Sequence, residues 1–439
     1  MEHDLRIGYL ECAGDDFISN VVINRNFVDL LGRFAEVVTT STTPPALGPA
    51  EIEGLHADYI LVDLQNFGFI PFMLREQNAL DVKFIVVLHT VYAWAGLLLY
   101  TLPLIKPGDI VLAPSESAKR SLLRMSPRTD VHVVRYCLDI RAIQETVATV
   151  GDTGLSHDIV YMGRLVPPKG LELLLDCMPA IRRKVGDVRL NIVGPLSGGS
   201  MGDQPVSPFV AALQRAAGRG ALDGHVVFHG ARFGPDKYRV LAASRLFVYP
   251  TSYTGETAAF SVIEAMTCGL PVVATRHGGI DELVTDGENG RLVDLRFDDR
   301  GAAVVENEQI VEAVTDMLRG RELTDRMRRF ARQRAMTHDY RAVMPPLLTL
   351  LRRHRTDTNR CAWETIRNRR PVDLDDVFAA EVRSLCRRAG VGGESLGWTF
   401  DDLMAHLRNG GRPRQPDRSA EGGSGASASG ELHRYLCLS

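Results

Sequence analysis

Two glutamates, Glu256 and Glu264, stand eight positions apart in the stretch GETAAFSVIEA, residues 255–265. The apolar run RLFVYP lies just before it and has the composition of a buried strand. We expect a helix to begin near Thr257, which would place Glu264 about two turns down, roughly 12 Å along the axis. The free N–H groups and the dipole at a helix start favour phosphate. Two carboxylates flanking such a site are suited to accept hydrogen bonds from hydroxyl groups.

Two cations follow an earlier predicted strand in the same half of the chain. The stretch IVYMGRLVPPKGLELLL places Arg164 and Lys169 just after IVYMG, with a helix expected to begin near Lys169. Parallel α/β sheets bind ligands at the carboxyl ends of their strands. Arginine holds a diphosphate bidentately, and lysine acts as a point charge. The two prolines between these cations form a stiff connection, which favours a positioned diphosphate site over two ordinary surface cations.

Both glutamates also have a purely structural interpretation. Glu256 would be an acid favoured by the dipole of a helix start, and Glu264 would be a partly buried helix acid paired with a cation. Taken together, however, the two cations, the helix start and the two carboxylates match a nucleotide-sugar. Such a molecule carries hydroxyl groups on both sides of its diphosphate, on the sugar and on the ribose.

The elements that must position these residues are short apolar runs that alternate with helical segments, a pattern typical of parallel sheets. The expected strands of the first half are LRIGYLECA, AEVVTT, DYILVDL, KFIVVLH, DIVLAPS and VHVVRYCLD. Those of the second half are IVYMG, VRLNIVG, HVVFHG, RLFVYP, PVVATR and GRLVD. We therefore expect an α/β protein with Rossmann-like domains over 1–152 and 153–330. A helical segment over 331–408 and a disordered Gly/Ser-rich tail over 409–439 would follow.

Composition and charge exclude several classes of protein. A chain of 439 residues is too long for one ordinary core. Its net charge of -3 gives no reason to expect nucleic acid. The seven cysteines form no C-x-x-C pair, which suggests reduced thiols in a cytoplasmic protein. No Cys/His cluster has metal-ligand spacing, so we expect no metal. The first residues, MEHDLRIGYL, do not read as a signal peptide.

One segment has the length of a transmembrane helix. FIVVLHTVYAWAGLLLYTLPLI, residues 84–105, carries no formal charge. It opens with β-branched residues, however, and Gly96 and Pro103 interrupt its second half. We interpret it as a buried strand, a loop and a buried helix, and expect no integral membrane span.

Charge is distributed unevenly along the chain. Residues 1–150 hold 12 Lys/Arg against 18 Asp/Glu, a net of -6, whereas residues 321–370 hold 14 Arg against 5 acids, a net of +9. No nucleic-acid module accompanies the basic segment. It is either a solvated helix or a helix that docks onto the acidic first domain.

Several motifs in order resemble the family-4 retaining glycosyltransferases of the GT-B fold. They are GRLVPPKG, the E-x7-E pair and GLPVVATRHGGIDELVTDGENGRLV. The resemblance is strong over about 158–295, weaker over 1–150 and absent after about 350. It implies two Rossmann-like domains facing across a cleft, the first binding the acceptor and the second the nucleotide-sugar. It also implies that the first part of the C-terminal helical segment returns to the N-terminal domain.

The resemblance implies a role for each site residue. Arg164 and Lys169 would hold the diphosphate, Glu264 the ribose hydroxyls and Glu256 the sugar hydroxyls. His89, at the end of KFIVVLH, resembles the histidine that faces the donor sugar from the first domain, although a lone histidine there is otherwise structural. The donor site would also include Gly163, Thr257, Ala258, Ala259 and Phe260. Transfer would be metal-independent, without a cofactor or a protein nucleophile.

Some residues depart from the pattern of the family. Ala259 stands where a glycine is usual, PTSYTGE is longer than the usual connection, and Tyr136-Cys137 replaces an Asn-Gly pair. These departures leave the sugar of the donor open, and the sequence does not distinguish UDP from GDP.

The acceptor is open as well. The acidic first domain favours a small soluble acceptor, with antibiotic biosynthesis as a conceivable setting. The alternatives are the synthesis of a cell-envelope glycan or glycolipid, a nucleotide-sugar epimerase or phosphorylase on the same fold, and a catalytically silent nucleotide-sugar binding protein.

Overall fold

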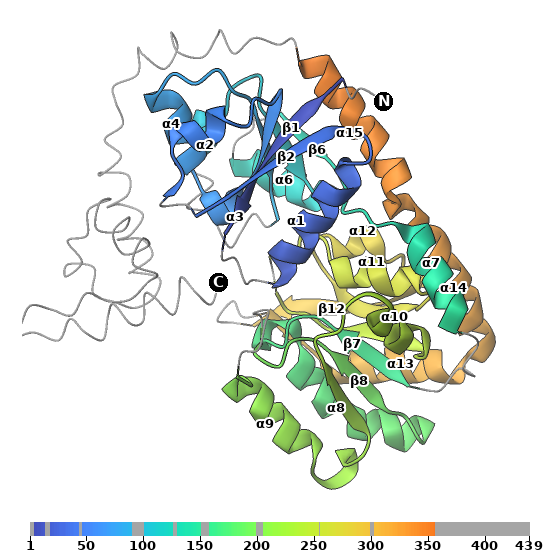
Figure 1. Ribbon diagram of the computed structural model, residues 1–439. Helices are drawn as coiled ribbons and strands as arrows, with labels where there is room; N and C mark the ends of the chain where they lie inside the picture. The colour runs from blue at the N-terminus through green and yellow to red at the C-terminus, as the bar shows by residue number, and fades with distance from the viewer. Residues whose placement is uncertain are drawn as a thin grey trace, which may run out of the picture. The chain divides into compact units, whose positions relative to one another are not determined.

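The computed structural model describes residues 4–13, 18–43, 46–89, 101–125, 130–150, 158–198, 205–253, 255–298 and 303–355. They form two sheets, each flanked by helices (Figure 1). The helical segment expected beyond residue 355 and the expected tail over 409–439 lie outside the described residues.

The first sheet is six-stranded and parallel throughout, in the order β2-β1-β3-β4-β5-β6. Its strands are β1 (Arg6–Cys12), β2 (Glu36–Thr42), β3 (Tyr59–Asp63), β4 (Phe84–Val87), β5 (Ile110–Ala113) and β6 (Val131–Val133). The helical elements between them are α1 (Ile18–Leu31), α2 (Pro49–Glu53), α3 (Leu64–Phe67), α4 (Ile70–Gln77), η2 (Leu102–Leu104) and α6 (Glu116–Met125).

The second sheet is seven-stranded, in the order β13-β12-β11-β10-β7-β8-β9. Its strands are β7 (Ile159–Met162), β8 (Leu190–Val193), β9 (Val226–Gly230), β10 (Leu246–Tyr249), β11 (Val272–Arg276), β12 (Gly290–Phe297) and β13 (Ala303–Val305). Its helical elements are α7 (Ile140–Val150), η3 (Pro167–Lys169), α8 (Leu171–Val185), α9 (Pro208–Ala217), η4 (Gly220–Leu222), α10 (Gly234–Ala242), α11 (Phe260–Thr267), α12 (Ile280–Leu283) and α13 (Asn307–Arg319). The last elements are α14 (Arg321–Ala335), η5 (Met336–His338) and α15 (Tyr340–His354).

The strands predicted from apolar runs are confirmed, and the α/β class with them. The structure adds β13, a short edge strand that pairs antiparallel with β12 and that we did not predict. Of the apolar segment 84–105, the structure confirms β4, while residues 90–100 lie outside the described part. No helix among the described residues is both long enough and apolar enough to cross a bilayer.

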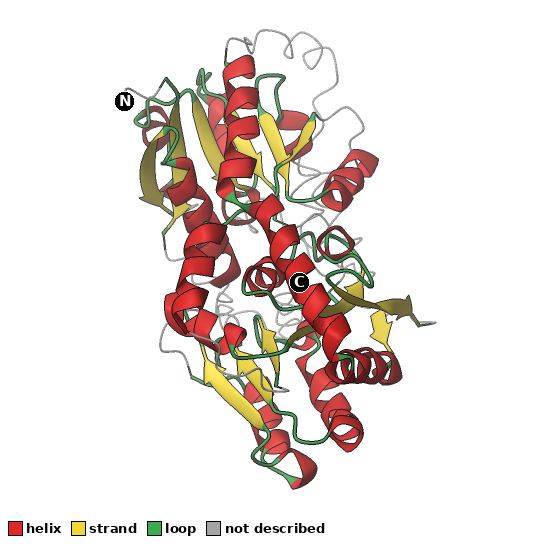
Figure 2. Cartoon of the chain, turned by 90° about the vertical axis from the view of Figure 1, so that its right-hand side faces the viewer, coloured by secondary structure: helices red, strands yellow, loops and turns green. Residues whose placement is uncertain are grey.

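Three clusters of buried side chains hold these layers together. One fills the faces of the second sheet, and the other two lie on opposite faces of the first. Ile140 and Ile143 of α7 pack in the second-sheet cluster, although we expected the domain boundary at residue 152. The C-terminal α15 packs instead on the first sheet, where Met344, Leu347 and Leu351 contact its buried residues. Figure 2 shows helices covering the strands of both sheets.

The chain passes between the two sheets twice, and the two passages lie side by side. Leu138 and Asp339 form a parallel bridge, and the Leu138 N–H donates to the His338 carbonyl at 2.9 Å. The His338 ring also contacts the Tyr136 carbonyl through Nδ1, at 2.8 Å. A movement of one passage must therefore involve the other.

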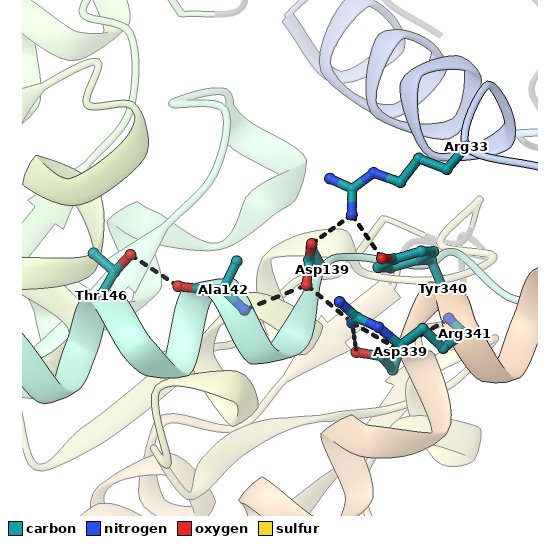
Figure 3. A network of polar contacts seen from close by, with 7 residues as sticks. All are labelled: Arg33, Asp139, Ala142, Thr146, Asp339, Tyr340 and Arg341. Atoms are coloured by element: carbon teal, nitrogen blue, oxygen red, sulfur yellow. Dashed lines mark hydrogen bonds and ion pairs between the residues drawn. The ribbon is translucent and has the colours of Figure 1, made fainter.

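A polar network fixes the start of α15 beside these passages (Figure 3). Arg33, just after α1, donates to Asp139 Oδ2 and to the Tyr340 hydroxyl, both at 2.7 Å. Arg341 reaches Asp139 Oδ1 at 3.1 Å, and the Asp339 carboxylate caps α15 by accepting from the Arg341 N–H at 2.9 Å. Burial alone would raise the pKa of Asp139, but the two guanidinium groups hold it below its usual value.

Ion pairs also join α15 to the first part of the chain. Arg352 pairs with Asp4 at 2.9 Å, and Arg355 pairs with Asp58 at the same distance. Of the two interpretations of the basic segment, the described residues therefore favour docking onto the first domain. Because these pairs are partly exposed to solvent, the apolar contacts of α15 contribute more to its binding than the charges do.

Candidate functional site

A pocket lies at the carboxyl ends of β7, β8 and β10 and brings most of the predicted site residues together. Its lining includes Gly163, Arg164, Lys169, Glu256, Ala258, Ala259, Phe260 and Glu264. It also includes three residues of α1, namely Ser19, Val22 and Ile23, so the first domain forms part of its wall. Thr257 and His89 are not among the lining residues.

Close backbone packing shapes the floor of the pocket around Gly163. The Gly163 N–H donates to the Val193 carbonyl at 3.0 Å. A Cβ atom added to Gly194 would lie 2.1 Å from the Gly163 carbonyl oxygen. Only a glycine at 194 therefore lets the ends of β7 and β8 approach this closely. The half-buried Arg164 follows, and its carbonyl accepts from the Tyr161 hydroxyl at 2.9 Å.

The stiff connection predicted between Arg164 and Lys169 ends in a short 3-10 turn, η3. Gly170 follows with a φ of 75°, which ends the turn, and α8 begins only at Leu171. The helix thus begins two residues after Lys169, close to the predicted start. A Cβ at Gly170 would lie 2.0 Å from the Pro250 carbonyl oxygen, so this turn is held against the end of β10.

The buried ammonium of Lys169 forms an ion pair with Glu256. Its Nζ lies 2.5 Å from Glu256 Oε2, and the Tyr249 hydroxyl donates to the same oxygen at 3.0 Å. Burial would raise the pKa of the Glu256 carboxyl, but the charge and hydrogen bond of Lys169 hold it below its usual value. Burial lowers the pKa of Lys169, and the negative charge of Glu256 opposes that effect. Glu256 is therefore ionised in the pocket.

Helix α11 begins at Phe260, so our expectation of a start near Thr257 was wrong. Residues 256–259 stay outside the helix, and the loop at 278–279 packs directly on their backbone. The Gly279 N–H donates to the Glu256 carbonyl at 3.0 Å, and a Cβ at Gly279 would lie 1.7 Å from the Thr257 carbonyl oxygen. Glu264 therefore lies about one turn inside the helix, roughly 6 Å from its start, rather than two turns.

Glu264 is also paired with a lysine, which we did not predict. Lys237 of α10 places Nζ 2.5 Å from Glu264 Oε1, and the Tyr238 hydroxyl lies 3.4 Å from the same oxygen. Both members of the ion pair are largely buried, with side-chain exposures of 12% and 7%. The structural interpretation of Glu264, a buried helix acid with a cation, is thus correct as far as it goes.

His89 lies apart from these groups and belongs to a buried polar chain in the first domain. Its Nδ1 contacts the Tyr136 hydroxyl at 2.9 Å, and its Nε2 contacts Asn24 Oδ1 at 2.8 Å. Asn24 in turn donates to Asp63 Oδ2 at 2.7 Å. Both ring nitrogens are therefore engaged. The backbone of His89 still meets the donor-side loop, because its carbonyl accepts from the Thr257 hydroxyl.

The sequence did not predict several residues of the site, namely Lys237, Tyr238, Tyr249 and the three residues of α1. Lys237 and Tyr238 stand in GPDKYRVLAAS, where no motif distinguishes them from surface residues. Tyr136 drew notice only as a departure from the Asn-Gly pair of the family. Its hydroxyl contacts His89, and its ring packs edge-on against Phe260 with centroids 6.1 Å apart. Within the described residues, no group of three or more His, Cys, Asp or Glu is arranged to hold a metal ion.

The part of the chain that carries most of these residues is similar to known glycosyltransferases. Residues 156–318 match the family model described as Glycosyl transferases group 1. The match to this family is confined to that part of the chain. A GDP-mannose-dependent alpha-(1-6)-phosphatidylinositol monomannoside mannosyltransferase of Mycolicibacterium smegmatis is 36% identical over 141 residues, 31% of this chain and 34% of that protein. A D-inositol 3-phosphate glycosyltransferase of Segniliparus rotundus is 31% identical over 34% of this chain and 31% of its own length. The chain thus spans about a third of the length of these relatives.

Solved structures show that the fold extends over both domains. A sucrose-phosphate synthase of Thermosynechococcus elongatus superposes with a TM-score of 0.63 and 18% identity, covering 80% of this chain and 98% of that one. HepE of Anabaena, solved with UDP-glucose, gives 0.62 and 20% identity over 80% of this chain and 100% of its own. The predicted GT-B architecture of two parallel-sheet α/β domains is therefore confirmed.

Proposed function

We propose that the protein transfers a sugar from a nucleoside-diphosphate-sugar to an acceptor hydroxyl with retention of the anomeric configuration. The charge of the pocket supports this proposal best. Among its described lining residues, Lys237 and Glu264 neutralise each other. Arg164, Lys169 and Arg232 stand against Glu256, a formal excess of two positive charges. That excess suits a diphosphate, while the carboxylates suit the hydroxyls at its two ends.

The proposed reaction needs no protein nucleophile. The acceptor oxygen forms a bond to the anomeric carbon as the bond from that carbon to the diphosphate breaks. The bonding electrons leave with the diphosphate, and a departing phosphate oxygen takes the acceptor's proton. Arg164 and Lys169 stabilise the charge that develops on the leaving group. Holding both substrates in one pocket supplies the remaining rate enhancement, because the reacting groups are already aligned.

For Lys169 to reach the diphosphate, it must share or exchange its contact with Glu256. In the structure Lys169 Nζ lies 2.5 Å from Glu256 Oε2. A bound diphosphate offers Lys169 a second anion, and Glu256 then accepts from sugar hydroxyls. We propose that donor binding replaces part of this ion pair. No metal takes part in the proposed step.

We propose a small soluble acceptor bound by the first domain, whose residues 1–150 carry a net charge of -6. An acidic surface repels anionic lipid headgroups, which argues against docking on a membrane. The lipid acceptor in the name of the mycobacterial relative is the second candidate, because that relative matches this chain by sequence. A cytoplasmic location and a role in antibiotic biosynthesis belong to the same proposal.

A transfer assay tests the proposal. Purified protein is incubated with UDP- or GDP-sugars and with a panel of soluble acceptors or lipid vesicles, and proton NMR reports the anomeric configuration of the product. We expect a product of retained configuration with a soluble acceptor. Products of inverted configuration would refute the retaining mechanism. Transfer only to lipid vesicles would show that the acceptor is a lipid and not a soluble molecule.

Two conservative variants test the roles of the carboxylates. Glu264→Gln should weaken the nucleoside diphosphate and the intact donor alike, by about ten- to hundredfold for a charged hydrogen bond. Glu256→Gln should weaken only the intact donor and slow transfer. Equal weakening of nucleoside diphosphate binding in both variants would contradict the assignment of the two ends.

A further inference from the structure

The two carboxylates of the pocket are held in the same way by different parts of the chain. Glu256 uses Oε2 for the Lys169 ammonium and the Tyr249 hydroxyl. Glu264 uses Oε1 for the Lys237 ammonium and the Tyr238 hydroxyl. In each case one carboxylate oxygen receives both contacts. Neither Glu256 Oε1 nor Glu264 Oε2 has a hydrogen-bond partner among the described residues.

We propose that Lys237 is a positioning residue for the nucleoside end of the donor. Together with Tyr238 it fixes Glu264 through Oε1, so that Oε2 accepts hydrogen bonds from the ribose hydroxyls. This inference rests on the proposed function, in which Glu264 recognises the ribose. It assigns to α10 a part in donor recognition, although α10 carries none of the residues that the sequence motifs indicate.

Burial explains why Glu264 requires such a partner. A carboxylate and an ammonium removed from water are costly unless they pair with each other and form further hydrogen bonds. Lys237 meets this need for Glu264, and the Tyr238 hydroxyl adds a second contact to the same oxygen. Because both contacts come from adjacent residues of one helix, they restrict the rotation of the carboxylate about its side chain. The position of Oε2 is therefore set by α10 as well as by α11.

The two lysines differ in their position relative to the proposed diphosphate site. Lys169 follows β7 on a short turn beside Arg164, where the diphosphate is proposed to bind. Lys237 stands on α10 and its ammonium lies 5.0 Å from the centroid of the Tyr238 ring. In our proposal Lys169 shares its contact with Glu256 with a phosphate when the donor binds, whereas Lys237 keeps its contact with Glu264.

The test compares ribose recognition in Lys237→Met with a matched control, Arg239→Met. Arg239 lies on the same helix, and its only described ion-pair partner is Asp236. Its side chain is 59% exposed, so this control removes a cation from α10 without touching Glu264. Calorimetry measures the affinities for UDP and GDP, for their 2′-deoxy and 3′-deoxy forms, and for inorganic pyrophosphate.

We expect the wild type and Arg239→Met to bind the ribonucleotide about tenfold or more tightly than a deoxy form, the value of a charge-assisted hydrogen bond. In Lys237→Met this preference should disappear, while pyrophosphate affinity stays within about threefold of wild type. Lys237→Arg should restore part of the preference. Glu264→Gln should abolish it, and the double variant with Lys237→Met should lose nothing more.

Two results would overturn the inference while leaving the proposed function standing. One is an unchanged ribose preference in a folded Lys237→Met protein that still binds UDP or GDP. The other is an equal loss of pyrophosphate and nucleotide affinity, which would place Lys237 on the phosphate or in the fold. If the wild type bound no nucleoside diphosphate and transferred no sugar, the proposed function would fail and this inference with it.

Discussion

Replacing Gly279 with alanine tests whether the loop before α11 must lie where the structure places it. The Gly279 backbone, with φ of -77° and ψ of -7°, suits any residue. A Cβ atom there would nevertheless lie 1.7 Å from the Thr257 carbonyl oxygen, whereas real Cβ atoms essentially never approach closer than 3.0 Å. The loop carrying Glu256 and Thr257 must therefore move by roughly 1.3 Å, the difference between the two distances.

Such a movement should affect transfer far more than folding. A misplacement of about 1 Å costs about 100-fold in rate, because the reacting groups lose their alignment. Overpacking of this kind costs about 1–3 kcal/mol of stability. We expect Gly279→Ala to fold, to melt a few degrees lower and to transfer sugar about 100-fold more slowly. Steady-state kinetics and a thermal melt measure both effects.

Gly218→Ala is the matched control for this variant. Gly218 has a φ of -82°, close to that of Gly279, but the nearest atom to its added Cβ is the Gln214 carbonyl oxygen at an ordinary 3.5 Å. It lies at the end of α9 and does not line the pocket. We expect the control to keep full activity and to gain up to about 1 kcal/mol of stability from reduced unfolded-chain entropy. If Gly279→Ala transferred sugar within twofold of this control, the loop would not position the reaction.

Three further predictions concern the cations, the absence of a metal and the passages between the sheets. Lys169→Ala and Arg164→Ala should each lower turnover by about 100- to 1000-fold, because losing one donor to a developing charge costs about 3–4 kcal/mol; near-normal turnover in a folded variant would remove the assignment. EDTA should leave transfer within twofold, because the cations of the pocket can neutralise the diphosphate; loss of activity with rescue by manganese or magnesium would contradict this. Burial lowers the pKa of His338 to about 4. Between pH 6.5 and 4, His338 therefore binds a proton in the unfolded chain but not in the folded chain. The free energy of unfolding should therefore fall by roughly 3 kcal/mol as the pH drops through that window, and this group should not affect it at higher pH. Urea unfolding of the wild type and of His338→Asn at several pH values measures this effect. An equal pH dependence in both proteins would exclude His338 as the cause.

Local features of the sequence were sufficient to predict the strands and the residues at their ends. Apolar runs such as IVYMG and RLFVYP became β7 and β10, because buried parallel strands need continuous apolar side chains. Residues that follow such strands meet at one edge of the sheet. The sequence alone therefore predicts that Arg164, Lys169 and the E-x7-E pair lie near each other.

Helix starts were predicted less accurately, because distant contacts decide them. The small residues of GETAAF allow a helix from Thr257. The glycine loop at 278–279 packs on the backbone of that segment, however, and α11 begins only at Phe260. Gly170 similarly separates the turn at Lys169 from α8. Neither close approach leaves a signal in the local sequence, since a glycine pair or an isolated glycine suits many turns.

The sequence by itself determined which residue types stand at the ends of the strands, and with them the kind of ligand the pocket suits. Only the tertiary structure decided which charges meet. It paired Glu256 with Lys169, 87 positions earlier in the chain, and Glu264 with Lys237 from another helix. It also engaged both ring nitrogens of His89 with Tyr136 and Asn24. Burial is the physical reason, because a charge or ring nitrogen removed from water requires a partner, and packing alone determines which partner is within reach.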